Sequence, residues 1–253
     1  MESLYSKIKI VHVPSEKEPF VVIDKPRGLA SAPLAPGDAS ALTWVAEKFP
    51  ETKNVSGKKA IEYGLVHRID TETRGLLLVA LTQEFYDRLI EEQTNGRFVK
   101  HYMAVCNFLG GQNMDDGFPT VSLEGQNFLN SIKNDSNSGE FSLEITSRFR
   151  PFGLKNKEVR PVNEFSGRAA EKKAGAKTYR TMVKVAKESD GYKAECRITE
   201  GYRHQVRCHL AWLGLPIKGD PVYGLSSKDG TSRAPFMFTA SGLEFLGFDF
   251  SIC

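Results

Sequence analysis

The sequence has little of what marks several large classes of protein, and each shortage excludes something. No stretch approaches 18 consecutive apolar residues, so we expect no transmembrane helix. The N-terminus lacks the basic-then-apolar layout of a secretory signal. The four cysteines have no CxxC spacing, which argues against both a zinc site and a disulfide framework. The sequence therefore predicts a protein of a reducing intracellular compartment, the cytoplasm.

Signatures of several enzyme classes are missing as well. No GxSxG nucleophile elbow is present, which excludes the common serine hydrolase arrangement. Neither a P-loop nor a GxGxxG motif occurs, so no nucleotide-phosphate loop is expected. His204 and His209 are five residues apart, a poor spacing for two metal ligands on one helical face. These absences predict no metal site.

The charge of the chain is distributed unevenly. A net charge of +3 is too small to indicate a nucleic-acid partner by itself. Residues 155–177, however, hold seven basic and only three acidic side chains. Just before them, residues 148–153 (RFRPFG) interleave basic and aromatic residues, a composition that suits stacking on bases and pairing with phosphates. A solvated loop and a packed turn explain these segments equally well.

Patterns typical of strands outnumber those typical of helices. Short hairpin-like connections dominate and no repeat occurs, so we expect an α+β fold: one domain with a mixed, largely antiparallel sheet and flanking helices and loops. Residues 110–139, rich in Gly, Asn, Asp and Ser, predict an insertion with one short strand over 120–123. The strands are expected over 20–24, 98–109, 141–145, 177–186, 192–199, 236–240 and 243–250, with an edge strand near 8–13; the helices are expected over 39–49, 82–94 and from about 201.

One polar segment interrupts an otherwise apolar stretch. Asp70 lies between Arg68 and Arg74, directly before the apolar run 76–81. An ion pair in a loop would explain these charges. A carboxylate surrounded by guanidinium groups also stays ionised and can act as a nucleophile or a base. The choice between a loop ion pair and a reactive carboxylate depends on the other polar segments.

Three further segments carry chemically useful side chains. The sequence KPRGL at residues 25–29 forms a basic turn after a buried strand. In the strand FVKHYMA at 98–104, the period of two places Lys100 and Tyr102 on one face, although a tyrosine at a core edge beside a snorkelling lysine is an alternative. Residues 201–210 (GYRHQVRCHL) open a helix with Arg, His and Gln, and its free N–H groups attract anions.

Taken together and in this order, these motifs resemble the RluA-type pseudouridine synthases. The resemblance runs from about Phe20 to Phe250 and rests on KPRGL, on HRIDTETRGLL at 67–77, on the segment at 98–104, and on GYRHQVRCHL followed by GLPIKGDPVYG at 214–224. It implies the pseudouridine synthase fold over 20–253, behind an N-terminal extension over 1–19 and without a separate N-terminal RNA-binding module. It also implies an isomerase that converts uridine in ribosomal or transfer RNA to pseudouridine, with no metal or organic cofactor, and we expect a monomer.

The resemblance assigns roles to individual residues. Asp70 would be the catalytic aspartate, attacking either the ribose C1′ or the uracil ring. Tyr102 would pack on the uracil and help to remove the C5 proton, and Arg207 would pair with Asp70 and keep it ionised. Arg68 would fill the gap left by the flipped base. The remaining candidates are expected to bind the substrate: His67, Lys25, Lys100, His204 and Gln205.

The chain departs from the family pattern at two places. Arg74 replaces a small hydroxyl residue, and Tyr202 and Arg203 stand where Arg and Thr are typical. Recognition of the RNA is expected to involve residues 148–177. Two alternatives remain at this point: a non-catalytic protein that binds or helps to fold RNA, and an enzyme of small nucleosides. Asp70, Tyr102 and Arg207 argue against the first, and the basic segment argues against the second.

Overall fold

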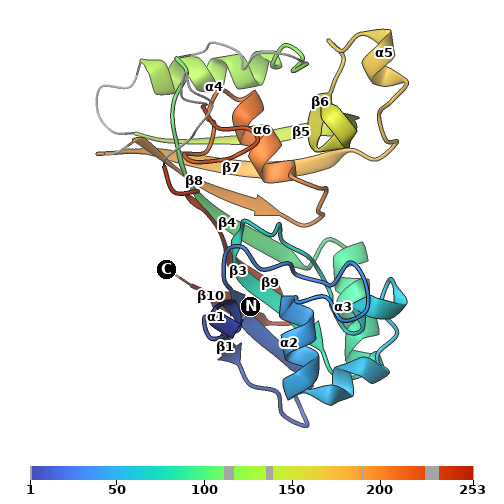
Figure 1. Cartoon of the computed structure of the whole chain (residues 1–253). Coiled ribbons are helices and arrows are strands. Elements are labelled where there is room, and N and C mark those ends of the chain that lie inside the picture. The colour runs from blue at the N-terminus through green and yellow to red at the C-terminus, as the bar shows by residue number, and fades with distance from the viewer. Residues whose placement is uncertain (1, 111–116, 135–138, 190, 226–233, 253) are drawn as a thin grey trace. The chain divides into compact units, whose positions relative to one another are not determined.

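The computed structural model describes residues 2–110, 117–134, 139–189, 191–225 and 234–252. By its internal contacts the chain divides into two compact units, one of residues 1–100 with 239–253 and one of residues 101–238. Their strands follow one another in a single 10-stranded sheet order, and Figure 1 draws the strands and helices of both units.

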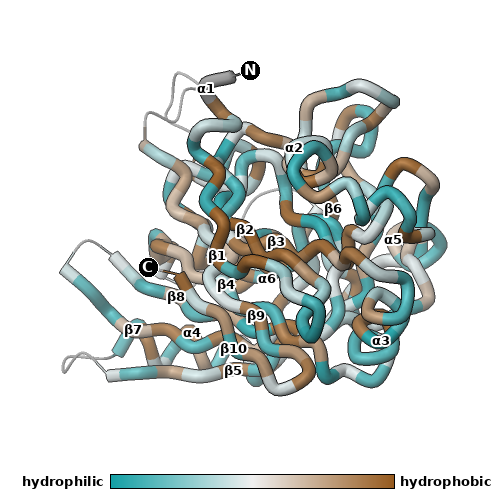
Figure 2. Tube along the Cα trace, turned by 90° about the horizontal axis from the view of Figure 1, so that it is seen from below, coloured by the Kyte–Doolittle hydropathy of each residue, from teal (hydrophilic) through white to brown (hydrophobic). Residues whose placement is uncertain are grey.

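The first unit is built around two central strands that are buried along nearly their whole length. β2 (Phe20–Lys25) lies antiparallel to β1 (Lys9–His12) on one side and to β3 (Arg74–Ala80) on the other. β3 pairs in parallel with β9 (Phe238–Phe245), and β10 (Phe248–Ser251) adds an antiparallel partner to β9. Both central strands are apolar along nearly their whole length (Figure 2), as expected for strands covered on both faces.

Helices cover this first sheet. Thr82 caps α3 (Gln83–Thr94) by accepting a hydrogen bond from the backbone of Phe85. Phe85 and Leu89 then pack with Phe20 in the core of the unit. Ser40 caps α2 (Ala41–Lys48) in the same way. The shorter helical segments are α1 (Glu2–Tyr5) and the 3-10 turns η1 (Pro50–Asn54) and η2 (Ala60–Glu62).

The second unit contains a longer antiparallel sheet. Its strands follow in the spatial order β4, β8, β7, β5 and β6. Along β8 the inward positions are buried from Ala194 to Ile198, which confirms the alternation seen in the sequence. The bounds are β4 Val99–Cys106, β5 Glu140–Phe152, β6 Glu158–Val162, β7 Tyr179–Glu188 and β8 Gly191–Ile198.

The described residues of this unit form three helices, and Figure 1 shows the two longer ones over the sheet. They are α4 (Leu123–Lys133), α5 (Arg168–Glu171) and α6 (Gln205–Trp212), and the 3-10 turn η3 (Leu154–Asn156) joins β5 to β6. α6 packs on β6 through Cys208 and Ala211, which lie in one cluster with Phe149 and Val159.

Several boundaries expected from the sequence were wrong. The strand over 120–123 does not form; instead Ser122 caps α4, whose buried face carries Phe128, Leu129 and Ile132. Residues 148–152 continue β5 rather than end it, and β6 was not expected. The turn between the last two strands lies at 246–247, where both residues adopt positive φ, and not at 241–242. Parts of the 110–139 insertion lie outside the described residues.

The fold class expected from the sequence is confirmed: the structure is α+β, with a mixed and mainly antiparallel arrangement of strands. The boundary between an extension over 1–19 and a domain over 20–253 stays a prediction. None of the helices in the described part of the chain is long and apolar enough to cross a membrane.

Candidate active site

Asp70 lies on a tight loop between two segments of the first unit. Residues 64–67 run beside β3, with Leu65 bridging Val79 and the backbone N–H of Val66 donating to Leu78. The chain then turns through residues 68–73 before β3 begins at Arg74. A backbone hydrogen bond of 3.0 Å from Thr73 to the carbonyl of Asp70 closes this turn. Asp70 itself is partly exposed.

Two side chains hold the residues on either side of Asp70. The hydroxyl of Ser31 donates to the carbonyl of Ile69 at 2.7 Å and accepts from its N–H at 3.1 Å. On the other side, the carbonyl of Thr71 accepts from the Lys25 ammonium at 3.2 Å and from the backbone N–H of Gly28 at 2.9 Å. The carboxylate is therefore carried by a backbone fixed at both neighbouring residues.

Lys25 is buried, and its ammonium faces main-chain oxygens. It also donates to the carbonyls of Pro26 at 3.1 Å and Leu29 at 2.6 Å. Burial lowers the pKa of Lys25 from 10.5 to about 8, and the charges of Asp70 and Glu72 oppose this shift. The lysine expected to bind substrate thus joins the KPRGL turn to the Asp70 loop and places a positive charge in the field of Asp70.

The two arginines beside Asp70 have carboxylate partners elsewhere in the first unit. Arg68 is half exposed and pairs with Glu62 at 3.1 Å. Arg74 makes a bidentate pair with the buried Asp24 of β2, with its Nη2 at 2.8 Å from Oδ2. This contact accounts for Arg74, the departure from the family pattern, since a small hydroxyl residue could not reach Asp24 across the two strands.

His67 and Lys100 are both buried in the first unit. The Nε2 of His67 accepts from the N–H of Leu78 at 3.2 Å, and its ring packs against Phe98. Burial, together with the charges of Lys100 and Lys58, lowers the pKa of His67 to about 3, so His67 is neutral at physiological pH. Its Nδ1 has no hydrogen-bond partner among the described residues. The ammonium of Lys100 lies 5.5 Å from the ring of Phe98.

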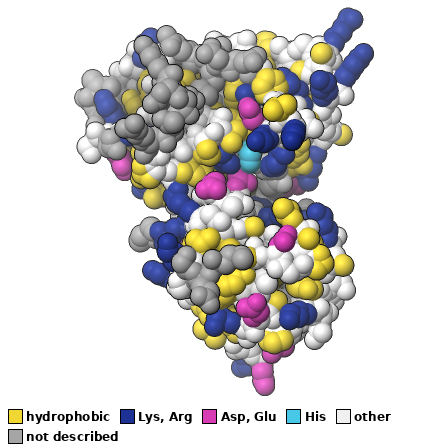
Figure 3. Space-filling model, in the orientation of Figure 1, with side chains coloured by type: hydrophobic (Ala, Val, Ile, Leu, Met, Phe, Trp, Pro, Cys, Tyr) yellow, Lys and Arg dark blue, Asp and Glu magenta, His cyan; other side chains and the backbone are white. Residues whose placement is uncertain are grey.

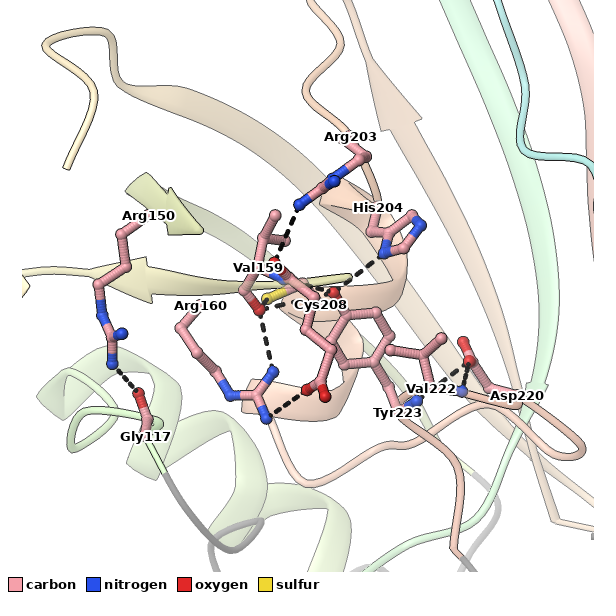
Figure 4. Close-up of polar contacts among 11 residues, drawn as sticks. Gly117, Arg150, Val159, Arg160, Arg203, His204, Cys208, Asp220, Val222 and Tyr223 are labelled. Carbon is pink, nitrogen blue, oxygen red and sulfur yellow. Dashed lines mark hydrogen bonds and ion pairs between the residues drawn. The ribbon is translucent and has the colours of Figure 1, made fainter. Parts of the chain in front are cut away.

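In the second unit, Arg207 is buried on α6 and pairs with Asp220. Its Nε and Nη2 donate to the two carboxylate oxygens at 2.8 and 2.6 Å. Oδ1 of Asp220 also accepts from the backbone N–H groups of Val222 and Tyr223 at 2.8 and 3.0 Å (Figure 4). The geometry fixes the orientation of the Arg207 guanidinium. The expected pairing of Arg207 with Asp70 joins residues of different units and stays a prediction.

His204 and Gln205 shape the start of α6. His204 has a left-handed backbone with φ 56°, and its Nδ1 lies 3.1 Å from the hydroxyl of Tyr223 (Figure 4). The buried Gln205 accepts from the N–H of Tyr202 and donates to Arg180 and Thr181 of β7. Gln205 therefore ties the helix start to the sheet, a structural task in addition to the expected contact with substrate.

Tyr102 stands on the inward face of β4. Its ring is stacked on Phe238 with 5.3 Å between centroids and 8° between planes. The alternation along the strand agrees with the expected period, since Lys100, Tyr102 and Ala104 are buried while His101 and Met103 are only partly so. The flat face of an immobilised tyrosine is a suitable surface for packing a planar base.

The structure groups the expected site residues within each unit. The loop of Asp70 is brought together with Lys25 in the first unit, and Arg207 with the His204 segment in the second. Ser31 was missed, because a lone serine in a loop carries no pattern that points to Ile69. No group of three or more His, Cys, Asp or Glu side chains in the described ranges could hold a metal ion.

Comparison with known proteins gives one consistent result. Residues 19–212 match the family model described as RNA pseudouridylate synthase. The chain is 28% identical over 214 residues to the ribosomal large subunit pseudouridine synthase D of Zymomonas mobilis, covering 84% of this chain and 56% of that protein. It is 26% identical over 213 residues to a Bacillus subtilis protein named as an uncharacterized RNA pseudouridine synthase, covering 83% of this chain and 56% of the relative.

Solved structures agree at the level of the fold. Human RNA pseudouridylate synthase domain containing 1 superimposes with a TM-score of 0.61 at 17% identity, over 98% of this chain and 83% of that chain. The fold of this chain is thus that of a pseudouridylate synthase. The chain belongs to the RNA pseudouridylate synthase family, and the resemblance to its RluA-type members is confirmed. It spans little more than half the length of the curated relatives named above.

Proposed function

We propose that this protein is an RNA pseudouridine synthase that isomerises specific uridines in structured RNA. The observation that carries the proposal is the Asp70 loop. It presents a partly exposed carboxylate at the position of the family motif, on a backbone fixed by Ser31 and Lys25. A solvated ion-pair loop would not need buried side chains on both sides of its aspartate. This arrangement fits a nucleophile that must be held in one orientation.

The reaction rearranges bonds within one nucleotide. The bond between ribose C1′ and uracil N1 breaks, the uracil turns, and a bond forms between C1′ and C5. The proton on C5 is then lost and N1 gains one, so the product is an isomer of the substrate. We assign to Asp70 the attack on either C1′ or the uracil ring, and no metal or organic cofactor is required by these steps.

The other expected site residues have supporting roles in this proposal. Tyr102 packs on the uracil and assists removal of the C5 proton. Its buried ring, stacked on Phe238, is held in a fixed position on β4, which suits packing against a base. Arg207, oriented by Asp220, supplies a positive charge that favours the ionised aspartate. Arg68 occupies the space of the flipped base, for which its half-exposed guanidinium would leave its pair with the buried Glu62.

The substrate is proposed to be ribosomal or transfer RNA, modified in the cytoplasm by a monomeric protein. Several relatives are named as ribosomal large subunit pseudouridine synthases, which favours ribosomal RNA as the first to be examined. Recognition is proposed to use the basic segment. Lys172 and Lys173 are exposed at the end of α5, and Figure 3 shows Lys and Arg side chains projecting at the end of the second unit where Figure 1 places α5.

Mapping pseudouridine in cellular RNA tests the proposal. Cells that lack the gene should lose pseudouridine at one or a few sites. The wild-type gene and the variant Asp249→Ala, which changes an exposed aspartate on β10, should restore those sites. The variant Asp70→Ala should not. Restoration by Asp70→Ala would instead support the alternative, a non-catalytic protein that binds or helps to fold RNA.

A further inference from the structure

The turn between β5 and β6 has an unusual backbone. Gly153 has φ 74°, and the two following non-glycine residues Lys155 and Asn156 have φ 54° and 55°. Left-handed conformations cost side-chain-bearing residues roughly 1 kcal/mol each, so two in succession persist only where neighbouring groups hold them. A strained backbone held in place is a reason to ask what the turn contacts.

Arg203 is the group that holds the turn. Its Nη2 donates to the carbonyl of Asn156 at 2.6 Å and to that of Glu158 at 3.0 Å, and Figure 4 shows the side chain extending towards the β6 strand. Next to it, the ring of Tyr202 stacks on Phe149 of β5 with 4.9 Å between centroids and 5° between planes. Tyr202 and Arg203, which depart from the family motif, thus attach the β5–β6 hairpin to the segment that leads into α6.

The turn carries an exposed apolar side chain followed by two cations. Leu154 is 80% exposed. Lys155 and Lys157 are exposed and take part in no ion pair within the described chain. The nearby Glu158 does not neutralise them, because its carboxylate pairs with Arg160 at 2.7 Å. Two cations and an exposed leucine on one preformed turn fit a phosphate backbone and its sugars.

We propose that the Gly153–Lys157 turn contacts the sugar–phosphate backbone of the RNA, and that Arg203 is the positioning residue that keeps the turn ready for binding. The inference rests on RNA being the substrate, as proposed above. A turn already held in its binding conformation loses less entropy on association than a free loop. Arg203 precedes His204, so the same segment links RNA contact at the turn to a residue expected to bind substrate.

Limited digestion with trypsin tests whether Arg203 holds the turn in place. Lys155 and Lys157 are cleavage sites inside the turn, and mass spectrometry locates the cut. Arg203→Thr should speed cleavage there several-fold, and Arg203→Lys, which keeps a cationic donor group but not the guanidinium, should give an intermediate rate. A melting curve establishes that each variant is folded. Unchanged cleavage in folded Arg203→Thr would overturn the positioning role.

Binding to end-labelled transfer RNA and fragmented ribosomal RNA tests the contact. Lys155→Ala/Lys157→Ala should weaken binding and reduce the slope of log K against log salt by about 1–2, the loss of roughly two phosphate contacts. Leu154→Ser should weaken binding without changing the slope. The matched control Lys133→Ala/Lys187→Ala removes two exposed lysines of the same unit and should change both quantities less.

Measuring pseudouridine formation in the same samples separates this inference from the proposed function. A wild-type protein that forms pseudouridine, together with Lys155→Ala/Lys157→Ala binding RNA no differently from the control, would overturn the proposed contact alone. Weaker binding by the turn variants, in a wild-type protein that forms no pseudouridine, would support the contact and contradict the proposed function.

Discussion

The hydroxyl of Ser31 makes two hydrogen bonds to Ile69, one to its carbonyl and one from its N–H, although the two residues are 38 positions apart in the chain. Ile69 directly precedes Asp70, so the orientation of the proposed nucleophile depends on a buried serine outside the loop. Lys25 completes the arrangement from the other side through the carbonyl of Thr71. This relationship makes the geometry of the Asp70 loop testable apart from its chemistry.

Ser31→Ala should lower kcat about 10- to 100-fold and leave KM little changed, because a displaced nucleophile affects the chemical step more than RNA binding. Ser31→Thr, which keeps a hydroxyl, should recover part of the loss. Steady-state kinetics with RNA from cells lacking the gene measures both constants. Ser15→Ala, which removes an exposed serine hydroxyl, is the control. A change in KM alone would argue that Ser31 serves RNA binding instead.

Lys25 should make stability depend on pH in the alkaline range. Its pKa is about 8 in the folded protein and 10.5 as a free side chain, so the unfolded chain binds the proton more tightly. The cost of burying the charge is fully present below pH 8 and disappears as the pH rises to 10.5. Relative to Lys25→Met, the wild type should therefore gain up to about 3 kcal/mol of unfolding free energy over this interval.

Urea denaturation of the wild type and Lys25→Met at several pH values measures this difference. Other groups titrate in both proteins, so their contributions cancel when one curve is subtracted from the other. A difference that stays constant from pH 8 to 10.5 would show that the pKa of Lys25 is not lowered by its burial.

The ion pair between Arg74 and Asp24 should stabilise the first unit. Arg74→Ala leaves the Asp24 carboxylate buried without this partner and should cost about 2 kcal/mol of unfolding free energy. Arg74→Ala combined with Asp24→Asn should cost less than the sum of the two single changes. Chemical denaturation of the four proteins gives the coupling, and strict additivity would contradict a direct interaction.

The basic side chains near α5 should not contribute equally to RNA binding. Lys177 pairs with Glu200 at 2.8 Å, while Lys172 and Lys173 form no ion pair within the described residues. Neutralising Lys172 and Lys173 should therefore weaken RNA binding and flatten its salt dependence more per charge than Lys177→Ala does. Fluorescence anisotropy across a salt series measures this, and unchanged affinity at every salt concentration would refute a role for the segment.

The sequence predicted the elements whose patterns are local. The cap of Thr82 and the apolar face of Phe85 and Leu89 indicated α3, and alternation indicated β4 and β8, because each signal repeats within a few residues. α4 escaped prediction because Gly125 and several polar residues dilute the pattern of its buried face, which only packing reveals. The sequence itself cannot distinguish a loop from a capped helix in such a stretch.

The same difference between local patterns and long-range contacts applies to the candidate site. Asp70, Tyr102 and Arg207 could be selected from motifs, but the partners of the charged side chains could not. Arg74 of β3 reaches Asp24 of the neighbouring β2, 50 positions away in the chain, and Arg203 reaches a turn more than 40 residues away, so neither contact can be detected in the local sequence. Long-range pairing explains the departures from the family pattern that the motifs alone left unexplained.

The central claim is that the Asp70 carboxylate performs the isomerisation. The most direct test incubates purified wild-type protein and Asp70→Asn with RNA from cells lacking the gene, and measures pseudouridine by mass spectrometry. The wild type should form pseudouridine at a specific uridine, and Asp70→Asn should form none while binding the RNA with similar affinity, because only the charge of one side chain differs. Pseudouridine formed by Asp70→Asn at the wild-type rate would contradict the account.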